Sequence, residues 1–247
     1  MSKLLTLCIT VFNEEENLPG LFEDIDKALS SFPELSLVFA ENGSSDTSRQ
    51  TLLEFASENA SKVEVVCIDQ NVGYGGGLAT AAEHAKTEFL CFFSADRQYS
   101  ADDLIQLITR FEQLKISGLT SFVVKGNRVV RSDSWSGRVV SAVYSRLARQ
   151  LLGIASKDIN ALPKIFPKSY IRQLGPYLSP QFFLDAQILS IAGINEDQII
   201  EVGVQFSDRA NGISSWAGKR VRTYLTTLVT LIRFRRILKS SVISRSK

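Results

Sequence analysis

The chain has 247 residues, 45% of them hydrophobic, and its 28 basic and 26 acidic residues nearly cancel. This length and apolar content suit one large α/β domain with a sizeable core. The single histidine, His84, lies in an alanine-rich stretch, which argues against a catalytic site built on histidine. We expect no secretory signal peptide. Three cysteines, Cys8, Cys67 and Cys91, fall in apolar runs, so we expect reduced, buried thiols in a cytoplasmic protein.

Apolar runs that alternate with helical patterns fill the first part of the chain. Strands are predicted at 4–11, 35–40, 63–68 and 89–93, and helices at 18–31, 47–59 and 78–86. Alternation of this kind predicts right-handed crossovers and a mainly parallel sheet. Ligands bind at the carboxyl ends of the strands in such sheets. The loops that follow the four strands should therefore converge on one site.

The first two strands run into polar loops. Residues 10–17 read TVFNEEEN, and residues 41–46 read ENGSSD. Both segments combine carboxylates with amide or hydroxyl groups. Their position at the carboxyl ends of strands favours a binding site over two unrelated turns.

The third loop, residues 71–78, reads NVGYGGGL. A dinucleotide fingerprint would follow the first strand and not the third, and the chain has no GxxxxGK[ST] segment. A nicotinamide or flavin oxidoreductase and a P-loop nucleotidase are therefore disfavoured. The glycines fit either a close approach of the backbone to a ligand or a tight turn into the next helix.

The fourth loop, residues 94–99, reads SADRQY and follows a run of five apolar residues. Asp96 and Gln98 offer oxygen ligands of the kind that Mg²⁺ takes. Ser100 and the acids at 102 and 103 form a predicted helix N-terminus. That helix start does not account for Asp96, which precedes it.

Taken together, the four loops make residues 4–110 resemble the nucleotide-binding half of a family 2 glycosyltransferase with the GT-A fold. The polyprenyl-phosphate sugar synthases, such as dolichol-phosphate mannose synthase, are the most similar in pattern. Residues 10–17, 41–46, 71–78 and 94–99 match four family motifs in order and spacing. A weaker resemblance continues to about residue 216, through residues 125–128, 158–166, 183–189 and 208–214.

The resemblance implies a nucleotide-sugar donor whose diphosphate is held by Mg²⁺ or Mn²⁺. Asp96 and Gln98 would bind the metal, with Ser94 as a weaker third ligand. Asp96 and Asp185 would be the catalytic residues, Asp185 as a base or an acid of the acceptor site. An exposed acid at a helix N-terminus is the alternative for Asp185. The donor-binding residues would be Thr10, Phe12, Asn13, Glu14, Glu41, Asn42, Gly73, Gly75, Ala95, Arg128 and Arg209.

Arginine is well suited to phosphate because its guanidinium matches phosphate geometry. Arg209, Arg128 and Arg131 are therefore candidates for contact with the diphosphate. For Arg128 and Arg131 a solvated basic surface is an equal alternative.

Three positions depart from the family pattern. Ser94 stands where the family has an aspartate, and loss of a carboxylate should weaken the binding of a hard cation. Asn42 replaces an acid, and Ser215 stands where a lysine is common. These departures leave two alternative functions for the chain. The first is a metal-dependent glycosyltransferase, and the second is a catalytically impaired relative that binds sugar nucleotides and acts in an assembly.

The charge is unevenly distributed. Residues 216–247 hold nine lysines and arginines and no acid, which leaves 19 of the 28 basic residues against all 26 acids elsewhere. The apolar segment 224–232 is shorter than the roughly 20 residues that a spanning helix needs. We divide the chain into a GT-A domain, 1–216, and a basic helix or tail, 217–247.

The tail and the similar segment 138–151 favour peripheral attachment to an anionic membrane surface, at the inner face of the membrane. The acceptor would then be a lipid phosphate or another membrane-associated molecule. A terminal helix packed on the core, with a solvated basic end, is the alternative for the tail. No sequence motif supports nucleic-acid binding.

Overall fold

The structure is a computed structural model that describes residues 5–132, 135–209, 211 and 220–240, with the backbone alone at 136 and 220–228. Ser215, residues 217–219 and residues 241–247, which enter the predictions above, lie outside the described residues. In chain order the elements are β1 (Leu5–Val11), α1 (Leu18–Ser31), β2 (Ser36–Asn42), α2 (Ser48–Glu58), β3 (Val63–Ile68), α3 (Tyr74–His84), β4 (Phe89–Ser94), α4 (Ala101–Ile116), β5 (Phe122–Arg131), α5 (Trp135–Leu152), β6 (Lys164–Pro167), α6 (Ser169–Leu174), the 3₁₀ turn η1 (Gly175–Tyr177), α7 (Phe183–Asn195), β7 (Gln198–Phe206) and α8 (Arg220–Lys239).

One seven-stranded sheet organises the molecule, in the order β3-β2-β1-β4-β6-β5-β7. β6 runs antiparallel to both of its neighbours, and every other pairing is parallel. Thr10 pairs with Ala40 on one side and with Ser94 on the other, so the ends of β1, β2 and β4 lie level. The predicted α/β fold, with a mainly parallel sheet and its polar loops at one edge, is confirmed.

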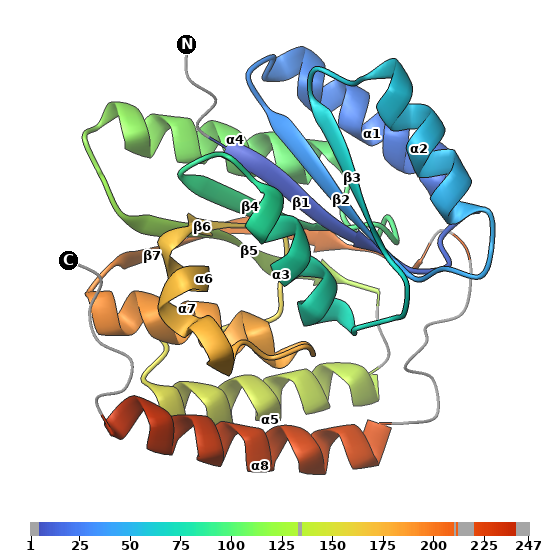
Figure 1. The fold of residues 1–247 in the computed structure, drawn as a ribbon. Helices are drawn as coiled ribbons and strands as arrows, with labels where there is room; N and C mark the ends of the chain where they lie inside the picture. Colours follow the sequence, from blue (N-terminus) through green and yellow to red (C-terminus); the bar gives the residue numbers. More distant parts are fainter. Residues whose placement is uncertain (1–4, 133–134, 210, 212–219, 241–247) are drawn as a thin grey trace.

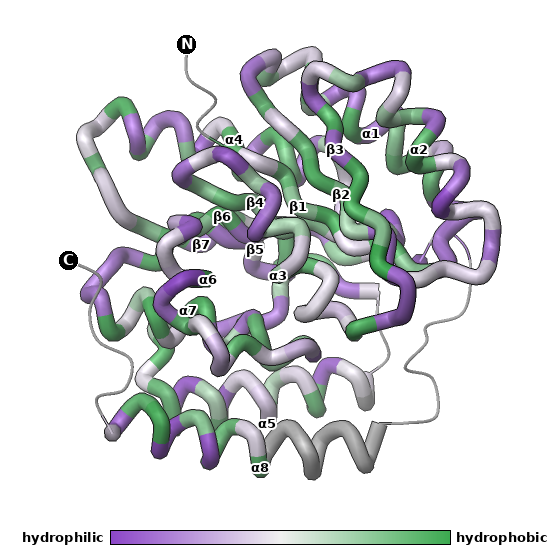
Figure 2. Tube along the Cα trace, viewed as in Figure 1, coloured by the Kyte–Doolittle hydropathy of each residue, from purple (hydrophilic) through white to green (hydrophobic). Residues whose placement is uncertain are grey.

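Helices cover both faces of the sheet. In Figure 1, α1, α2 and α4 lie above the sheet, while α3, α6 and α7 lie below it, with α5 and α8 side by side at the bottom. The five apolar residues of β4 are buried, as a central strand requires. Figure 2 shows the same contrast, with hydrophobic residues along the central strands and hydrophilic residues in the surrounding loops and helices.

The C-terminal helix α8 packs against α5 and α7. Phe234 is buried, and its ring meets that of Phe183 edge-to-face at 5.5 Å. The described part of the tail therefore contributes to the core, while Arg233 and Arg236 are exposed.

Several boundaries differ from the sequence predictions. α1 and β3 occupy the predicted residues, and Ser100 caps α4 through a reciprocal bond with Asp103. α3 begins at Tyr74, four residues early, because its glycines join the first turn. Cys67 is exposed, and the prediction of a buried thiol was wrong there. It lies on β3, an edge strand, whereas Cys8 and Cys91 are buried in β1 and β4.

Candidate active site

The loops after β1 and β2 are joined by reciprocal hydrogen bonds. The backbone N–H of Asn13 donates to Ser44 Oγ at 3.1 Å, and that of Ser45 donates to Asn13 Oδ1 at 2.8 Å. Asn13 has a φ of 53°, in the left-handed region that asparagine tolerates well. Glu15 accepts from the backbone N–H of Thr47 at 2.9 Å. The two loops form one wall at the edge of the sheet.

Two predicted donor-binding residues, at the end of β2, hold the loops in place. The buried carboxylate of Glu41 accepts from Arg49 Nε and from the backbone N–H of Ser44, both at 2.6 Å. The buried amide of Asn42 donates to Gly73 O at 3.1 Å and accepts from the Val72 N–H at 3.0 Å. Glu41 therefore fixes the β2 loop, and Asn42 fixes the loop that leads into α3.

The glycines of the third loop lie against the chain itself. The N–H groups of Gly75 and Gly76 donate to the carbonyl of Pro180 at 2.9 and 3.3 Å, which supplies the start of α3 with an acceptor. Gly73 has a φ of 84°, and a Cβ there would lie 2.4 Å from the same carbonyl. Tyr74 stacks on Phe182, with ring centroids 4.4 Å apart. The close approach seen here is to segment 179–182 of the chain itself, and the loop turns directly into α3.

Gly75→Ala should lower stability, because the new Cβ would lie 2.3 Å from Ser179 O and 2.6 Å from Gln181 O. Overpacking against backbone costs about 1–3 kcal/mol, and each kcal/mol lowers Tm by about 2–4 °C in a chain of this size. Thermal unfolding checks this. Gly193→Ala is the matched control, because among the described residues its Cβ would meet no atom closer than Gly153 O, at 3.5 Å. Equal Tm values for the two variants would contradict the role given to Gly75.

Asp96 lies two residues beyond β4, and both of its carboxylate oxygens have partners among the described residues. Its Oδ1 accepts from the hydroxyl of Ser94 and from the backbone N–H of Gln98, the latter at 3.3 Å. Its Oδ2 lies 3.2 Å from Arg209 Nη2. Only 11% of the Asp96 side chain is exposed, so the carboxylate is mostly sheltered from water.

Arg209 links the loop that follows β1 to the loop that follows β4. Its Nη1 lies 3.3 Å from Glu14 Oε1, while Nη2 reaches Asp96. Asn17 donates to the other oxygen of Glu14 at 2.6 Å. Burial raises the pKa of Glu14, and the hydrogen bond from Asn17 and the charge of Arg209 oppose that rise. Asn17, which sequence reasoning missed, is a buried amide that orients the Glu14 carboxylate.

The remaining predicted residues of this edge follow β1 and β4. Gln98 donates through Nε2 to Ser207 O at 3.1 Å, and Ala95 is buried. Phe12 is half-buried at the end of β1. The Thr10 hydroxyl is buried, has no hydrogen-bond partner among the described residues, and lies where a Cβ on Gly77 would reach it.

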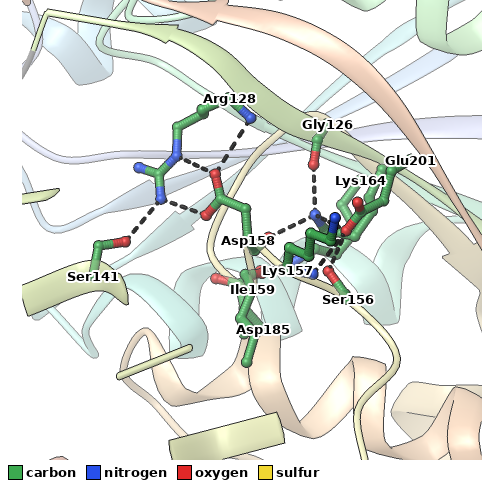
Figure 3. A network of polar contacts seen from close by, with 11 residues as sticks. Gly126, Arg128, Ser141, Ser156, Lys157, Asp158, Ile159, Lys164, Asp185 and Glu201 are labelled. Atoms are coloured by element: carbon green, nitrogen blue, oxygen red, sulfur yellow. Dashed lines mark hydrogen bonds and ion pairs between the residues drawn. The ribbon is translucent and has the colours of Figure 1, made fainter. Parts of the chain in front are cut away.

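Arg128, on β5, forms a buried ion pair with Asp158. Its Nε and Nη2 donate to the two carboxylate oxygens at 2.7 and 2.6 Å (Figure 3). Its guanidinium lies over the Phe206 ring. Burial by itself would raise the pKa of Asp158, but the hydrogen bonds and charge of Arg128 lower it. Arg131 lies at the end of the same strand, three residues further on. The structure thus gives Arg128 a carboxylate partner that the sequence did not indicate.

Asp185 lies in the first turn of α7 and is 1% exposed. Its Oδ1 accepts a hydrogen bond from Lys164, on β6, and its buried Oδ2 has no hydrogen-bond partner among the described residues. The alternative of an exposed helix-terminal acid is therefore wrong. Lys164 and Lys125, both fully buried, were not predicted as part of the site; a lysine within an apolar strand is the signal that could have pointed to them.

The residues at the end of β4 can be tested for metal binding. Among the described residues, no three His, Cys, Asp and Glu side chains form a metal-binding group. Asp96, Ser94 and Gln98 are nevertheless all oxygen donors, and Mg²⁺ is commonly held by one or two carboxylates together with substrate phosphates and water. Arg209, beside Asp96 Oδ2, already places a positive charge there. The donor set fits a hard cation that binds together with a diphosphate.

A mainly parallel sheet with one antiparallel strand, β6, and with acidic and amide-bearing loops at one edge has the architecture of the GT-A fold. The sequence model described as glycosyl transferase family 2 matches residues 6–175, and the chain belongs to this family.

Solved structures of similar fold include glucosyl-3-phosphoglycerate synthase from Mycobacterium tuberculosis in complex with Mn²⁺, UDP-glucose and phosphoglyceric acid. Its TM-score is 0.67 at 18% identity, over 94% of this chain and 80% of that one. S. aureus TarS 1–349 in complex with UDP gives a TM-score of 0.59 at 15% identity, over 95% of this chain and 65% of that one. At these identities the likeness shows the shared fold.

Proposed function

We propose that this chain transfers a sugar from a nucleotide-sugar donor to a membrane-associated acceptor, of which a polyprenyl phosphate is the example that the sequence resemblance implies. The observation that carries the proposal is the cluster of Asp96, Arg209 and Glu14 at the carboxyl edge of the sheet. This cluster joins three loops that are far apart in the sequence. Binding of UDP and UDP-glucose by structures of the same fold supports a nucleotide-sugar donor.

The residues of the cluster have complementary roles toward a diphosphate. Arg209 offers a guanidinium whose geometry matches phosphate oxygens. Asp96, Ser94 and Gln98 would hold Mg²⁺ or Mn²⁺, and this ion would supply positive charge to the departing diphosphate. The wall formed by Asn13, Ser44 and Ser45 would face the nucleoside.

A thermal-shift screen tests donor binding. We expect one class among UDP-, GDP- and dTDP-sugars to raise Tm, and Mg²⁺ or Mn²⁺ to increase the shift, because a ligand bound only to the native state stabilises it. A ligand at about 100 times its Kd adds about 2.7 kcal/mol, or roughly 5–10 °C in a chain of this size. No shift with any donor, with or without metal, would contradict the proposed function.

A surface on α5 and α8 supports the membrane part of the proposal. Trp135, Val139 and Val143 follow one another at four-residue spacing on α5 and are 79%, 40% and 53% exposed. On α8, Val229 and Ile232 are exposed as well. Among the side chains that the structure describes on these helices, the exposed basic ones are Arg138, Arg146, Arg149, Arg233, Arg236 and Lys239.

Neither α5 nor α8 contains an acid, and the two helices lie side by side (Figure 1). An apolar stripe flanked by arginines is typical of helices that lie in the interface of an anionic bilayer. In the part of the chain that the structure describes, no helix is both long and apolar enough to cross a bilayer.

Vesicle sedimentation tests this surface. Arg146, Arg149 and Arg236 changed together to glutamine should weaken binding to anionic vesicles at least about tenfold, because each basic residue near such a surface contributes about 1 kcal/mol. Glutamine at Lys27, Lys86 and Arg110, which are exposed residues away from α5 and α8 in the fold, is the matched control. Raising the salt concentration should weaken binding of the unmodified protein. Equal pelleting of both variants, or equal binding to neutral vesicles, would argue against the surface.

A second function, binding of sugar nucleotides without catalysis, is favoured by Ser94. A hydroxyl in place of a carboxylate removes one anionic ligand from the predicted metal site. A donor that binds tightly but is neither transferred nor hydrolysed would support this function over the first.

A further inference from the structure

A second cavity lies at the edge of the sheet opposite to the donor site. It has a volume of about 580 Å³, and its lining residues precede β4, β5 and β7 or follow the antiparallel strand β6. Phe89 pairs with Pro167, and Phe122 pairs with Gln198, so these strand ends lie at the same edge. The length of β4 separates this edge from the loop of Asp96 by about 20 Å. The cavity is therefore distinct from the donor site, and its volume is in the range of small-molecule sites.

Hydrogen bonds fix several side chains of this cavity in place. Asp197, which precedes β7, accepts at Oδ2 from Ser121 Oγ at 2.7 Å and from the hydroxyl of the fully buried Tyr170. The amide of Asn195 exchanges two hydrogen bonds with that of Gln173, at 3.2 and 3.1 Å. A ligand would lose little free energy to the ordering of these groups, because the fold already orders them.

The lining carries more positive than negative charge. Lys86, Lys168 and Arg172 contribute cations, and Glu88 and Asp197 contribute acids. Lys86 and Glu88 each lie 3.8 Å from a residue of opposite charge outside the lining. The charges left to the cavity are therefore those of Lys168, Arg172 and Asp197, and their sum favours an anionic ligand.

The two remaining cations are neighbours. Lys168 donates through Nζ to the carbonyls of Ala85 and Glu83, which holds its ammonium group at the wall of the cavity. Arg172 follows Lys168 by one turn of α6, so the two side chains lie on the same side of this helix. Arg172 is exposed and has no hydrogen bond or ion pair in the part of the chain that the structure describes. A guanidinium that is not engaged, next to an ammonium held in place, is suited to phosphate.

The cavity also offers partners for hydroxyl groups. Oδ1 of Asp197 has no hydrogen-bond partner among the described residues, since both hydroxyls that contact this carboxylate donate to Oδ2. The hydroxyls of Thr120 and Ser169, which line the cavity, likewise have no partner within the described ranges. Of the lining residues, Pro167 alone is apolar. Such a lining suits a small hydrophilic anion and does not suit a lipid chain.

We propose that this cavity binds a small phosphate ester that carries hydroxyl groups, such as a phosphorylated polyol or sugar. Arg172 and Lys168 bind the phosphate, and Asp197 accepts a hydrogen bond from a hydroxyl of the ligand at Oδ1. This second site does not rest on the proposed glycosyl transfer, because it shares no residue with the donor site.

A titration followed by NMR of the backbone amides tests the site, with glycerol 3-phosphate as the probe. We expect saturable shifts of the amide signals of Ser121, Ser169 and Asn195, all of which line the cavity. Propyl phosphate lacks the hydroxyls and should bind at least about threefold more weakly, the scale of one lost hydrogen bond. Glycerol, which lacks the phosphate, should cause no saturable shift.

Arg172→Gln should raise the Kd of glycerol 3-phosphate at least about tenfold, because hydrogen bonds between charged groups are the stronger ones. Its exposed position means that the fold should be retained. Arg110→Gln, at an exposed arginine of α4, is the matched control and should keep the Kd within about twofold. Arg209→Gln should likewise keep the Kd for this cavity, because Arg209 belongs to the donor site at the opposite edge.

The outcomes separate this site from the donor site. No saturable shift at the three amides, or an unchanged Kd in Arg172→Gln, would overturn the proposal. Shifts confined to residues 12–17 and 96–98 would also overturn it, because the phosphate would then occupy the donor site alone. Equal affinity for propyl phosphate would overturn the contact of a ligand hydroxyl with Asp197. The thermal shift caused by the nucleotide sugar, which tests the proposed function, should be the same in Arg172→Gln as in the native chain.

Discussion

Asp96→Asn should reduce glycosyl transfer by at least about 100-fold, comparable to the loss of a single charge-stabilising group in other enzymes, with little change in the unliganded fold. Asparagine keeps the size of the side chain but removes the charge that faces Arg209 at 3.2 Å. The increase in donor affinity with Mg²⁺ or Mn²⁺ should disappear together with activity. Steady-state kinetics and thermal shifts, with and without the metal, provide the measurement.

Asp102→Asn is the matched control, because Asp102 is an exposed aspartate in the first turn of α4, six residues along the chain. It should retain full activity. Ser94→Asp is the companion variant, and restoration of a second carboxylate should tighten metal binding. Normal turnover in Asp96→Asn would show that Asp96 is not a residue of the active site. Unchanged metal affinity in Ser94→Asp would mean that position 94 does not face the metal.

The edge of the sheet could be predicted because each of its strands is a short apolar run that ends in polar residues. A strand covered on both faces, such as β4, is continuously apolar, and its end is marked where Asp96 appears. Parallel pairing then places such ends together without further information. The amphipathic pattern of α1, with a proline in its first turn, likewise predicts its bounds from local chemistry alone.

The partners of the charged residues could not be predicted, because they depend on contacts between distant segments. Arg128 meets Asp158 thirty residues away, and Lys164 meets Asp185 across two elements. Local composition does not distinguish an arginine that is available to bind phosphate from one that is paired with a carboxylate. Cys67 illustrates the same limit, since its exposure follows from the position of β3 at the sheet edge.

Arg128→Met should lower the free energy of unfolding at neutral pH by about 3 kcal/mol, the typical cost of leaving one partner of a buried ion pair uncompensated. The Arg128 and Asp158 side chains are only 8% and 11% exposed, so water cannot replace the lost guanidinium. Urea unfolding provides the measurement. Arg110→Met, at an exposed position of α4, is the control and should change stability by no more than about 0.5 kcal/mol.

The loss of stability in Arg128→Met should depend on pH, because it depends on the charge of Asp158. The native pKa of Asp158 is lowered, so its carboxylate stabilises the fold above the unfolded pKa of about 3.9, and this contribution is lost as pH falls through the native pKa. The difference in the free energy of unfolding between the native chain and Arg128→Met should therefore become smaller below about pH 4. Donor affinity separates the two roles of Arg128. Unchanged stability with a large loss of donor affinity would favour the diphosphate contact, whereas lost stability with near-normal affinity in the folded fraction would assign Arg128 to the ion pair with Asp158.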